Sequence, residues 1–175
     1  VMDLGAFKHT VDEGLDCRKA AFECVNTMLD LCPNLLDARA LVATLPSGLG
    51  DHYDIKMIAH TLLLKLSQGA VPNSTDAVLA SLDSFCEPLD KTLTARMKRD
   101  AVQQEIERNN DLLRGALRAV RSINRHGVTS GANVVDSWKK FNADAVDGNE
   151  KVAHIVAELD AEAAAPPNNS GAEQK

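Results

Sequence analysis

Three segments of the sequence begin in the same way. Each opens with an aspartate, continues with an apolar and a basic residue, and then carries apolar residues at helical spacing. The first two start at Asp16 and Asp54, and a looser version starts at Asp111. A repeat of about 40 residues that holds two helices is typical of an α-solenoid. Because such chains usually bind other proteins, we expect an interaction module rather than an enzyme.

The composition also favours stacked helices. Of the 175 residues 45 % are apolar but only 3 % are aromatic, so Leu, Val, Ile, Ala and Met must build the core. A β-sandwich would need more aromatic and β-branched residues. The formal net charge of −6 argues against bulk nucleic-acid binding, which needs cations to neutralise phosphates. Since no run of about 18 apolar residues occurs, we expect no membrane span.

Four cysteines are unevenly distributed along the chain. Cys17 and Cys24 lie on one apolar stripe of a predicted helix, Cys32 follows at its end, and Cys86 is distant. We expect them to be small buried residues rather than disulfides, which indicates a reducing compartment. The first residues lack the basic start and apolar core of a signal peptide. Because the sequence starts at Val1, we expect a further part of the chain before it.

The beginning of the chain has a different periodicity from the rest. Phe7, His9 and Val11 alternate with polar residues, which predicts an extended strand over 4–12. A single strand is unstable in water without a partner. We therefore expect one half of a hairpin, whose other strand precedes Val1.

Helical periodicity predicts the remaining elements. We expect helices over 15–31, about 36–45, about 51–67, from a cap at Ser74 or Thr75 to about Leu89, and about 101–124, with a loop at 91–100 and two short helices around Trp138 and Ile155, separated at Gly148-Asn149. Pro33, Pro46-Ser47-Gly48 and His126-Gly127 are predicted helix ends, and Pro88 is expected to end or kink its helix. The helix over 51–67 is apolar on most sides, which predicts an inner helix between neighbouring repeats.

Basic residues form a stripe on the helix over 101–124 and just beyond it. Arg114, Arg118, Arg121 and Arg125 follow one another at spacings of four, three and four. Most such stripes are solvated helix faces, but this one could bind an acidic protein surface. Nucleic acid is the less favoured ligand, because no aromatic residues interleave for base stacking. The two short helices that follow are expected to cap the solenoid with a polar outer face.

Histidine, cysteine and aspartate residues do not form a pattern of catalytic or metal sites. His9, His52 and His60 lack paired ligand spacing, and the cysteines fall on predicted core positions. Asp16 and Asp54 suit helix starts, where a carboxylate caps backbone amides, better than an acid pair. We therefore expect no metal, no cofactor and no catalysis.

The repeated openings resemble the second helices of HEAT repeats. Three segments have a more specific sequence: 5–16 reads GAFKHTVDEGLD, 51–57 reads DHYDIKM and 85–89 reads FCEPL. Over about 4–125 the sequence resembles the C-terminal end of the cullin-associated neddylation-dissociated proteins. This HEAT-repeat family is also described as TATA-binding-protein-interacting.

The resemblance implies a function. In this family a long horseshoe wraps a cullin scaffold that lacks its ubiquitin-like modifier, and its last repeats hold the N-terminal region of the cullin. A β-hairpin from these repeats occupies ground that a substrate-receptor adaptor would use, so the protein acts as an exchange factor for ubiquitin ligases. The resemblance also implies a cytoplasmic and nuclear location, with no cofactor.

These inferences define the expected protein. It is an all-α solenoid of HEAT-type helix pairs with a short N-terminal strand and a C-terminal helical cap, divided into a hairpin remnant at 1–13, repeats at 14–125, a cap at 126–162 and a disordered tail at 163–175. The candidate partner-binding residues are Leu4, Gly5, Phe7, Lys8, His9, Arg114, Arg118 and Arg121. The expected partners are the unmodified cullin and preceding repeats of the same chain, without nucleic acid or membrane. The alternative is a helical scaffold that contacts a transcription factor such as TATA-binding protein.

Overall fold

The computed structural model describes residues 2–4, 7–9, 12–129 and 135–164, and these residues are mainly helical. The elements in order are β1 (Met2–Leu4), β2 (Phe7–His9), α1 (Leu15–Leu31), η1 (Pro33–Leu35), α2 (Ala38–Leu49), α3 (Tyr53–Ser67), α4 (Ser74–Ala80), α5 (Leu82–Leu93), α6 (Gln103–Thr129), α7 (Asp136–Phe141), η2 (Asn142–Asp147) and α8 (Glu150–Ala164). The helical architecture agrees with the α-solenoid that the sequence predicts.

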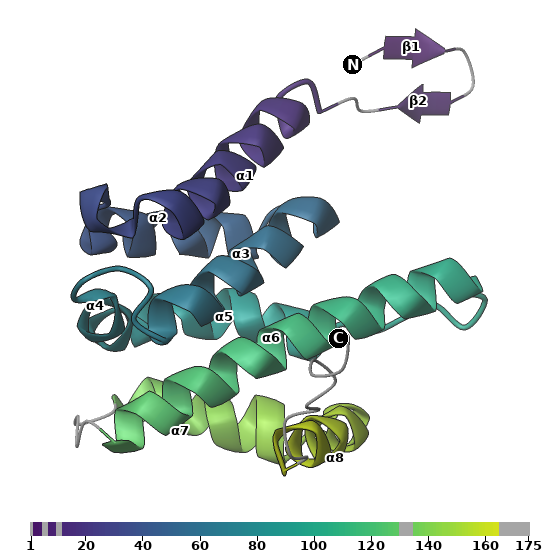
Figure 1. Ribbon diagram of the computed structural model, residues 1–175. Coiled ribbons are helices and arrows are strands. Elements are labelled where there is room, and N and C mark those ends of the chain that lie inside the picture. The colour runs from purple at the N-terminus through teal and green to yellow at the C-terminus, as the bar shows by residue number, and fades with distance from the viewer. Residues whose placement is uncertain (1, 5–6, 10–11, 130–134, 165–175) are drawn as a thin grey trace, which may run out of the picture.

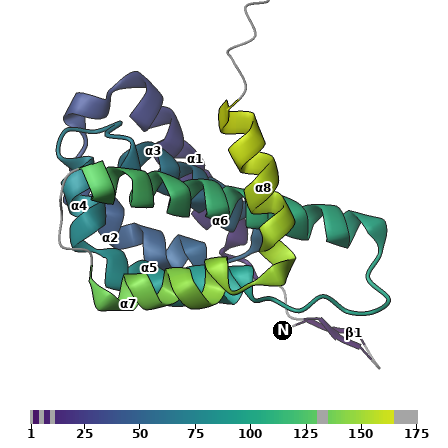
Figure 2. The ribbon, with the colours of Figure 1, turned by 90° about the horizontal axis from the view of Figure 1, so that it is seen from below.

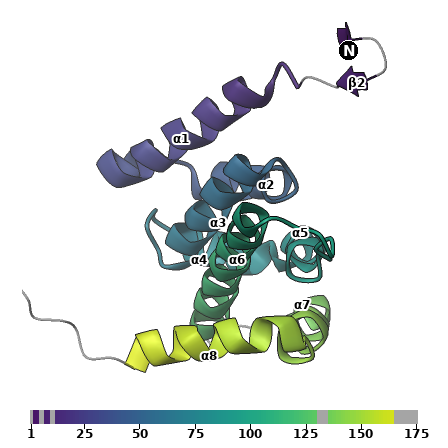
Figure 3. The same ribbon diagram turned by 90° about the vertical axis from the view of Figure 1, so that its right-hand side faces the viewer.

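The helices form two layers (Figures 1 and 2). Helices α1, α3 and α6 lie in one layer, and α2, α5 and α7 lie in the other, with α4 at one end of the second layer. Helix α3 packs against α1, α2 and α6. Helix α8 lies at the end of the stack farthest from α1 (Figure 3). Stacked helix pairs of this kind bury their apolar faces against their neighbours.

Helix α3 is the central element of the core. Its residues Ile55, Ala59, Leu62, Leu63 and Leu66 are all 1 % exposed or less. These residues share one face of the helix, and the partly buried Ile58 and Leu64 extend the apolar surface on either side of it. Helices α1, α2, α4 and α6 pack around α3. The prediction of a buried inner helix at this position is therefore confirmed.

Two predicted helix ends are wrong. Pro46 lies inside α2, which continues to Leu49, and Gly127 lies inside α6, which continues to Thr129. Gly48 has a packing role instead, because a Cβ atom at this position would lie 2.4 Å from the ring of Phe22 on α1. The glycine thus permits close approach of two helices rather than ending one of them.

The single helix expected up to Leu89 is also wrong, because α4 and α5 are separate helices that meet at Ser81. Pro88 lies inside α5, which extends to Leu93 and shortens the expected loop. Asn73, in a left-handed conformation with φ of 61°, precedes α4 in place of the expected serine or threonine cap. Ser74 instead donates its hydroxyl to the Leu66 carbonyl oxygen at 2.8 Å, which joins α4 to α3.

The strand expected over 4–12 is not formed as such. In its place two three-residue strands, β1 and β2, pair in antiparallel fashion with Leu4 opposite Phe7. The partner of β2 is therefore a neighbouring segment of the same chain and not a strand before Val1. A short connection brings antiparallel strands together more readily than a distant segment. Parts of the expected strand, at 5–6 and 10–11, lie outside the described residues.

The expected burial of Cys17 and Cys24 is wrong, since both side chains are exposed. Helix α1 turns Phe22, Val25 and Leu29 toward the core. In the part of the chain that the structure describes, nothing covers the opposite face, so the cysteines remain at the surface.

The end of the chain agrees with a helical cap. Helices α7 and α8 bury Trp138, Phe141, Val152 and Ile155, and a separation at 148–149 lies between η2 and α8. Helix α8 continues to Ala164, and the rest of the expected tail lies outside the described residues. The division of the chain into four domains stays a prediction.

Candidate functional site

The predicted arginine stripe lies on α6 and faces α8. We call Arg114, Arg118, Arg121 and Arg125 the arginine face; residues three and four apart share one side of a helix. A guanidinium nitrogen of Arg114 donates to Glu158 at 2.9 Å, and one of Arg118 donates to Glu162 at 3.0 Å. Both glutamates belong to α8, and they also lie four residues apart. Two parallel ion pairs therefore join α6 to α8.

Arg121 strengthens the same junction. Its guanidinium pairs with Asp160 and donates a second hydrogen bond to the Val156 carbonyl oxygen at 3.0 Å. Only 26 % of its side chain is exposed. The acidic residues of α8 thus offset much of the positive charge that the sequence assigns to a partner surface.

The ion pair of Arg114 and Glu158 shifts the pKa values of both groups. The hydrogen bond from Arg114 holds the pKa of the Glu158 carboxyl below its usual value, and the same bond raises the pKa of Arg114. Both groups therefore stay charged at neutral pH. An acidic partner would have to compete with α8 for these arginines.

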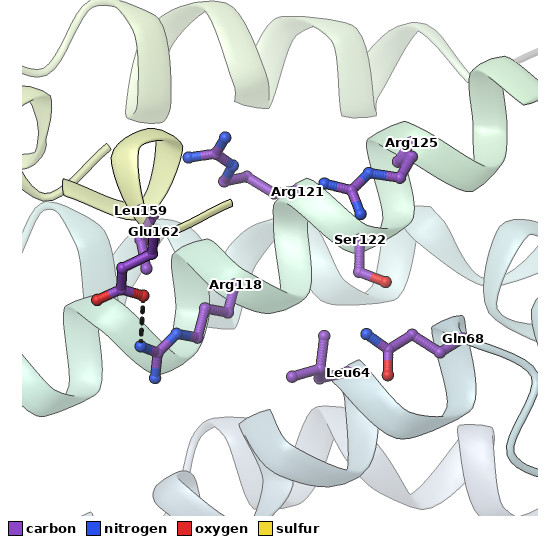
Figure 4. Close-up of a pocket in the computed structure, with 8 residues that line it drawn as sticks. All are labelled: Leu64, Gln68, Arg118, Arg121, Ser122, Arg125, Leu159 and Glu162. Atoms are coloured by element: carbon purple, nitrogen blue, oxygen red, sulfur yellow. Dashed lines mark hydrogen bonds and ion pairs between the residues drawn. The ribbon is translucent and has the colours of Figure 1, made fainter. Parts of the chain in front are cut away.

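A cavity of about 300 Å³ adjoins the arginine face (Figure 4). It lies between α3, α6 and α8 and is lined by Leu64, Gln68, Arg118, Arg121, Ser122, Arg125, Leu159 and Glu162. At the α3–α6 contact beside it, the buried hydroxyl of Ser67 hydrogen-bonds that of Ser122 at 2.7 Å. The mixed apolar and cationic lining suits contact with a protein side chain. Of its polar groups, the Ser122 hydroxyl is hydrogen-bonded to Ser67 and the Glu162 carboxylate accepts from Arg118.

A second cavity, of about 170 Å³, continues along the same α3–α6 seam. His60 lines it, is 1 % exposed, and has both ring nitrogens buried without a hydrogen-bond partner. Burial lowers the pKa of His60 to about 4, so the ring is neutral at physiological pH. Gly115 lies against the ring, since a Cβ atom there would be 3.3 Å from Nδ1. The sequence places His60 beside leucines but gives no sign that the ring lacks partners.

At the end of the stack that lies away from α8 (Figure 3), acidic residues pair with basic residues of α1. Arg18 donates to Asp51 at 2.7 Å and to Asp12 at 2.7 Å, and Lys19 pairs with Asp54 at 3.5 Å. Hydrogen bonds from Arg18 lower the pKa of both Asp12 and Asp51. These pairs fix the start of α1 against the start of α3.

The expected capping by Asp16 and Asp54 is not observed. Gly14 and His52 occupy the cap positions of α1 and α3, without side-chain capping bonds. Both aspartates instead lie in the first helical turn, where a negative charge meets the positive end of the helix dipole. Their role at helix starts is therefore electrostatic.

The two groups of predicted partner-binding residues lie apart. Leu4, Phe7, Lys8 and His9 belong to β1 and β2, before α1, whereas the arginines belong to α6 and face α8. Gly5 lies outside the described residues. Contact of either group with a partner stays a prediction.

Other chemistry has little support in the described ranges. There, no group of three or more His, Cys, Asp or Glu side chains is placed to hold a metal ion. Nor does any helix within these ranges have the length and apolar character to cross a membrane.

Comparison with known proteins gives consistent matches. Residues 1–145 match the family described as TATA-binding protein interacting (TIP20). The chain is 52 % identical over 80 % of its length to cullin-associated NEDD8-dissociated protein 1 of Arabidopsis thaliana, and 43 % identical over 70 % to protein 2 of Rattus norvegicus. It is also 33 % identical over 71 % of its length to the C-terminal part of protein 1 of Emericella nidulans. The matches cover 11 %, 9 % and 12 % of these relatives, so the chain spans about a tenth of their length.

Proposed function

The chain belongs to the TATA-binding protein interacting (TIP20) family, and on this basis we propose that it is a cullin-binding segment of a ubiquitin-ligase exchange factor. The relatives are named for association with cullins and for dissociation from NEDD8. The identity of 52 % to the Arabidopsis thaliana protein is the observation that carries the proposal.

The proposed partner is the N-terminal region of a cullin without its ubiquitin-like modifier. The hairpin residues Leu4, Phe7, Lys8 and His9 are the proposed contact, together with Gly5. Two short paired strands joined to a helical stack support this role, because strand elements outside a rigid scaffold often recognise partners. The hairpin would occupy the cullin surface that the substrate-receptor adaptor also uses. Binding of the hairpin would therefore weaken binding of the adaptor to the cullin, and the adaptor would weaken binding of the hairpin by the same factor.

A second proposed contact is intramolecular. The outer face of α1 exposes apolar residues, with Leu31 78 % exposed and Met28 37 % exposed. Ala20 and Cys24 on the same face are exposed as well. Preceding HEAT repeats of the same chain would bury this face, as neighbouring repeats do in solenoids.

The proposed mechanism is steric, without catalysis or a cofactor. The described cysteines are unpaired, which supports action in the reducing environment of cytoplasm and nucleus. The second candidate function is contact with TATA-binding protein. The observation behind it is the description of the family as TATA-binding protein interacting.

A binding titration separates the two candidates. The chain is titrated into an unmodified cullin N-terminal region and, separately, into TATA-binding protein. We expect binding to the cullin, and about tenfold weaker binding after the double substitution Phe7→Ala and Lys8→Glu. Tight binding to TATA-binding protein with none to the cullin would favour the second candidate.

A further inference from the structure

The segment between α5 and the middle of α6 extends from the helical stack. We call residues 94–107 the arm; it comprises a loop and the beginning of α6. Every residue of the arm except Ala101 is exposed. Figures 1 and 2 show this end of α6 and the preceding loop reaching beyond the other helices.

Local contacts order the arm. The Val102 amide donates to the Glu105 carboxylate at 3.2 Å, and the Gln103 amide donates to Glu107 at 2.9 Å. At the base, the Arg108 guanidinium lies 5.4 Å from the centre of the Tyr53 ring on α3. A cation over an aromatic face is attracted by the ring. The helical part of the arm is thus held by local hydrogen bonds, and Arg108 anchors it to the central helix.

The arm exposes apolar side chains. Met97 is 37 % exposed, Val102 60 % and Ile106 36 %. Val102 and Ile106 lie four residues apart, so they share one side of the helix start. Among the described residues few large apolar side chains are exposed to this degree, and these three are close in sequence. Val102 and Ile106 thus form a small exposed apolar surface on the helix start, and a surface of this kind can serve as an interaction site.

The positive charge of the arm is confined to its loop, residues 94–102, which has three basic residues and one acidic residue, whereas the helix start carries Glu105 and Glu107. Arg96, Lys98 and Arg99 lie in this loop, and none of them forms an ion pair with a described residue. This contrasts with Arg114 and Arg118, whose charges are paired with α8. In a chain of net charge −6, a basic loop is complementary to an acidic surface.

The arm and the hairpin project from the same edge of the fold. Arg18 joins the start of α1 to Asp51, just before α3, and Arg108 of α6 joins Tyr53, the first residue of α3. The chain leaves this edge toward β1 and β2 at the start of α1. Figures 1 and 2 show the hairpin and the end of α6 on one side of the stack.

We propose that the arm is a second contact element, which binds a protein surface that is apolar at its centre and acidic at its rim. The inference rests on the proposed function, because the hairpin would bring the same partner to this edge. A protein fits better than nucleic acid, since phosphates give no burial to Met97, Val102 and Ile106 and the arm has no aromatic residue for base stacking. Rim charges of this kind raise the association rate and select the partner.

A charge-reversal experiment tests the arm. Lys98→Glu with Arg99→Glu alters the arm, and Lys140→Glu with Lys151→Glu makes the same charge change on exposed residues of α7 and α8. Titration of each chain into the unmodified cullin N-terminal region should give about tenfold weaker binding for the arm variant and little change for the control. The weakening should shrink at high salt. A second variant, Val102→Ser with Ile106→Ser, should weaken binding without a change in melting temperature.

The outcomes distinguish the arm from the function on which it rests. Equal affinity of the arm variants and the control would overturn the arm proposal and leave cullin binding intact. Failure of the unaltered chain to bind would overturn both. If the charge-reversed arm loses binding to a 20-nucleotide oligonucleotide but keeps cullin binding, the ligand of the arm is nucleic acid and the proposal is wrong.

Discussion

Arg18 donates from Nε to the Oδ2 atom of Asp51 at 2.7 Å, and so joins the first turn of α1 to a residue two positions before the start of α3. A second nitrogen of the same guanidinium reaches Asp12. One side chain thereby holds the helix start from which the hairpin emerges. The stability that these hydrogen bonds contribute therefore depends on pH.

Replacement of Arg18 with methionine should reduce stability most at neutral pH. Hydrogen bonds from Arg18 depress the pKa of Asp51 and Asp12, so their stabilising contribution is present above the unfolded-state pKa of about 3.9 and is lost as pH falls through the lower folded-state value. Melting temperatures of both chains at pH 7 and below pH 3 should therefore differ clearly at pH 7 and converge in acid. A gap that stays constant with pH would contradict this account.

His60→Leu should remove a second pH dependence of stability, which arises from the burial of a neutral ring and not from an ion pair. Burial lowers the pKa of His60 to about 4, and its unfolded-state value is about 6.5, so protonation favours unfolding between these values. The native chain should lose about 2 kcal/mol of unfolding free energy between pH 7.5 and pH 5 through this group. Urea denaturation at both pH values measures the loss. The leucine variant should lose correspondingly less, and an unchanged difference would show that His60 does not titrate in this way.

Gly48→Ala should destabilise the α1–α2 contact by about 1–3 kcal/mol, because its Cβ would overlap the ring of Phe22 at 2.4 Å. Gly50→Ala is the matched control, since the nearest atom to its Cβ would be a carbonyl oxygen at 3.6 Å. The smaller side chain of Phe22→Leu should offset part of the cost in the double variant. Chemical denaturation of the unaltered chain, Gly48→Ala, Phe22→Leu and the double variant gives the coupling energy between the two positions. Additive effects would contradict a direct overlap.

Reversal of Arg118 to glutamate should loosen the second half of α8. The substitution breaks the pair with Glu162 and places two like charges together. Backbone amides after Leu159 should then exchange hydrogen for deuterium faster, while those near Val152, which is buried, should not. The reciprocal change Glu162→Arg should restore slow exchange. Without restoration, the effect of Arg118 would not arise from this pair.

The sequence predicts the fold best where the spacing of residues within a single helix determines the feature. The bounds 15–31 of α1 and the buried state of α3 follow from apolar spacing alone. The wrong ends at Pro46 and Gly127 arise because tertiary packing decides whether a proline or glycine ends a helix. Similarly, the exposure of Cys17 depends on which elements cover α1, and its spacing cannot reveal this.

The candidate site was predicted less completely. The arginine face was recognisable from spacing, but its acidic partners lie 44 residues further along the chain. No local pattern links Arg114 to Glu158 or Arg118 to Glu162 across that distance. The unpaired basic residues of the arm loop likewise become apparent only after the paired arginines are known.

Competition with the substrate-receptor adaptor tests the central proposal most directly. The chain is titrated into an unmodified cullin N-terminal region alone and into the same region saturated with its adaptor. We expect binding to the cullin alone and at least tenfold weaker binding in the presence of the adaptor, because the hairpin and the adaptor would share one surface. Equal affinity in both titrations would contradict a shared surface and, with it, the proposed role in receptor exchange.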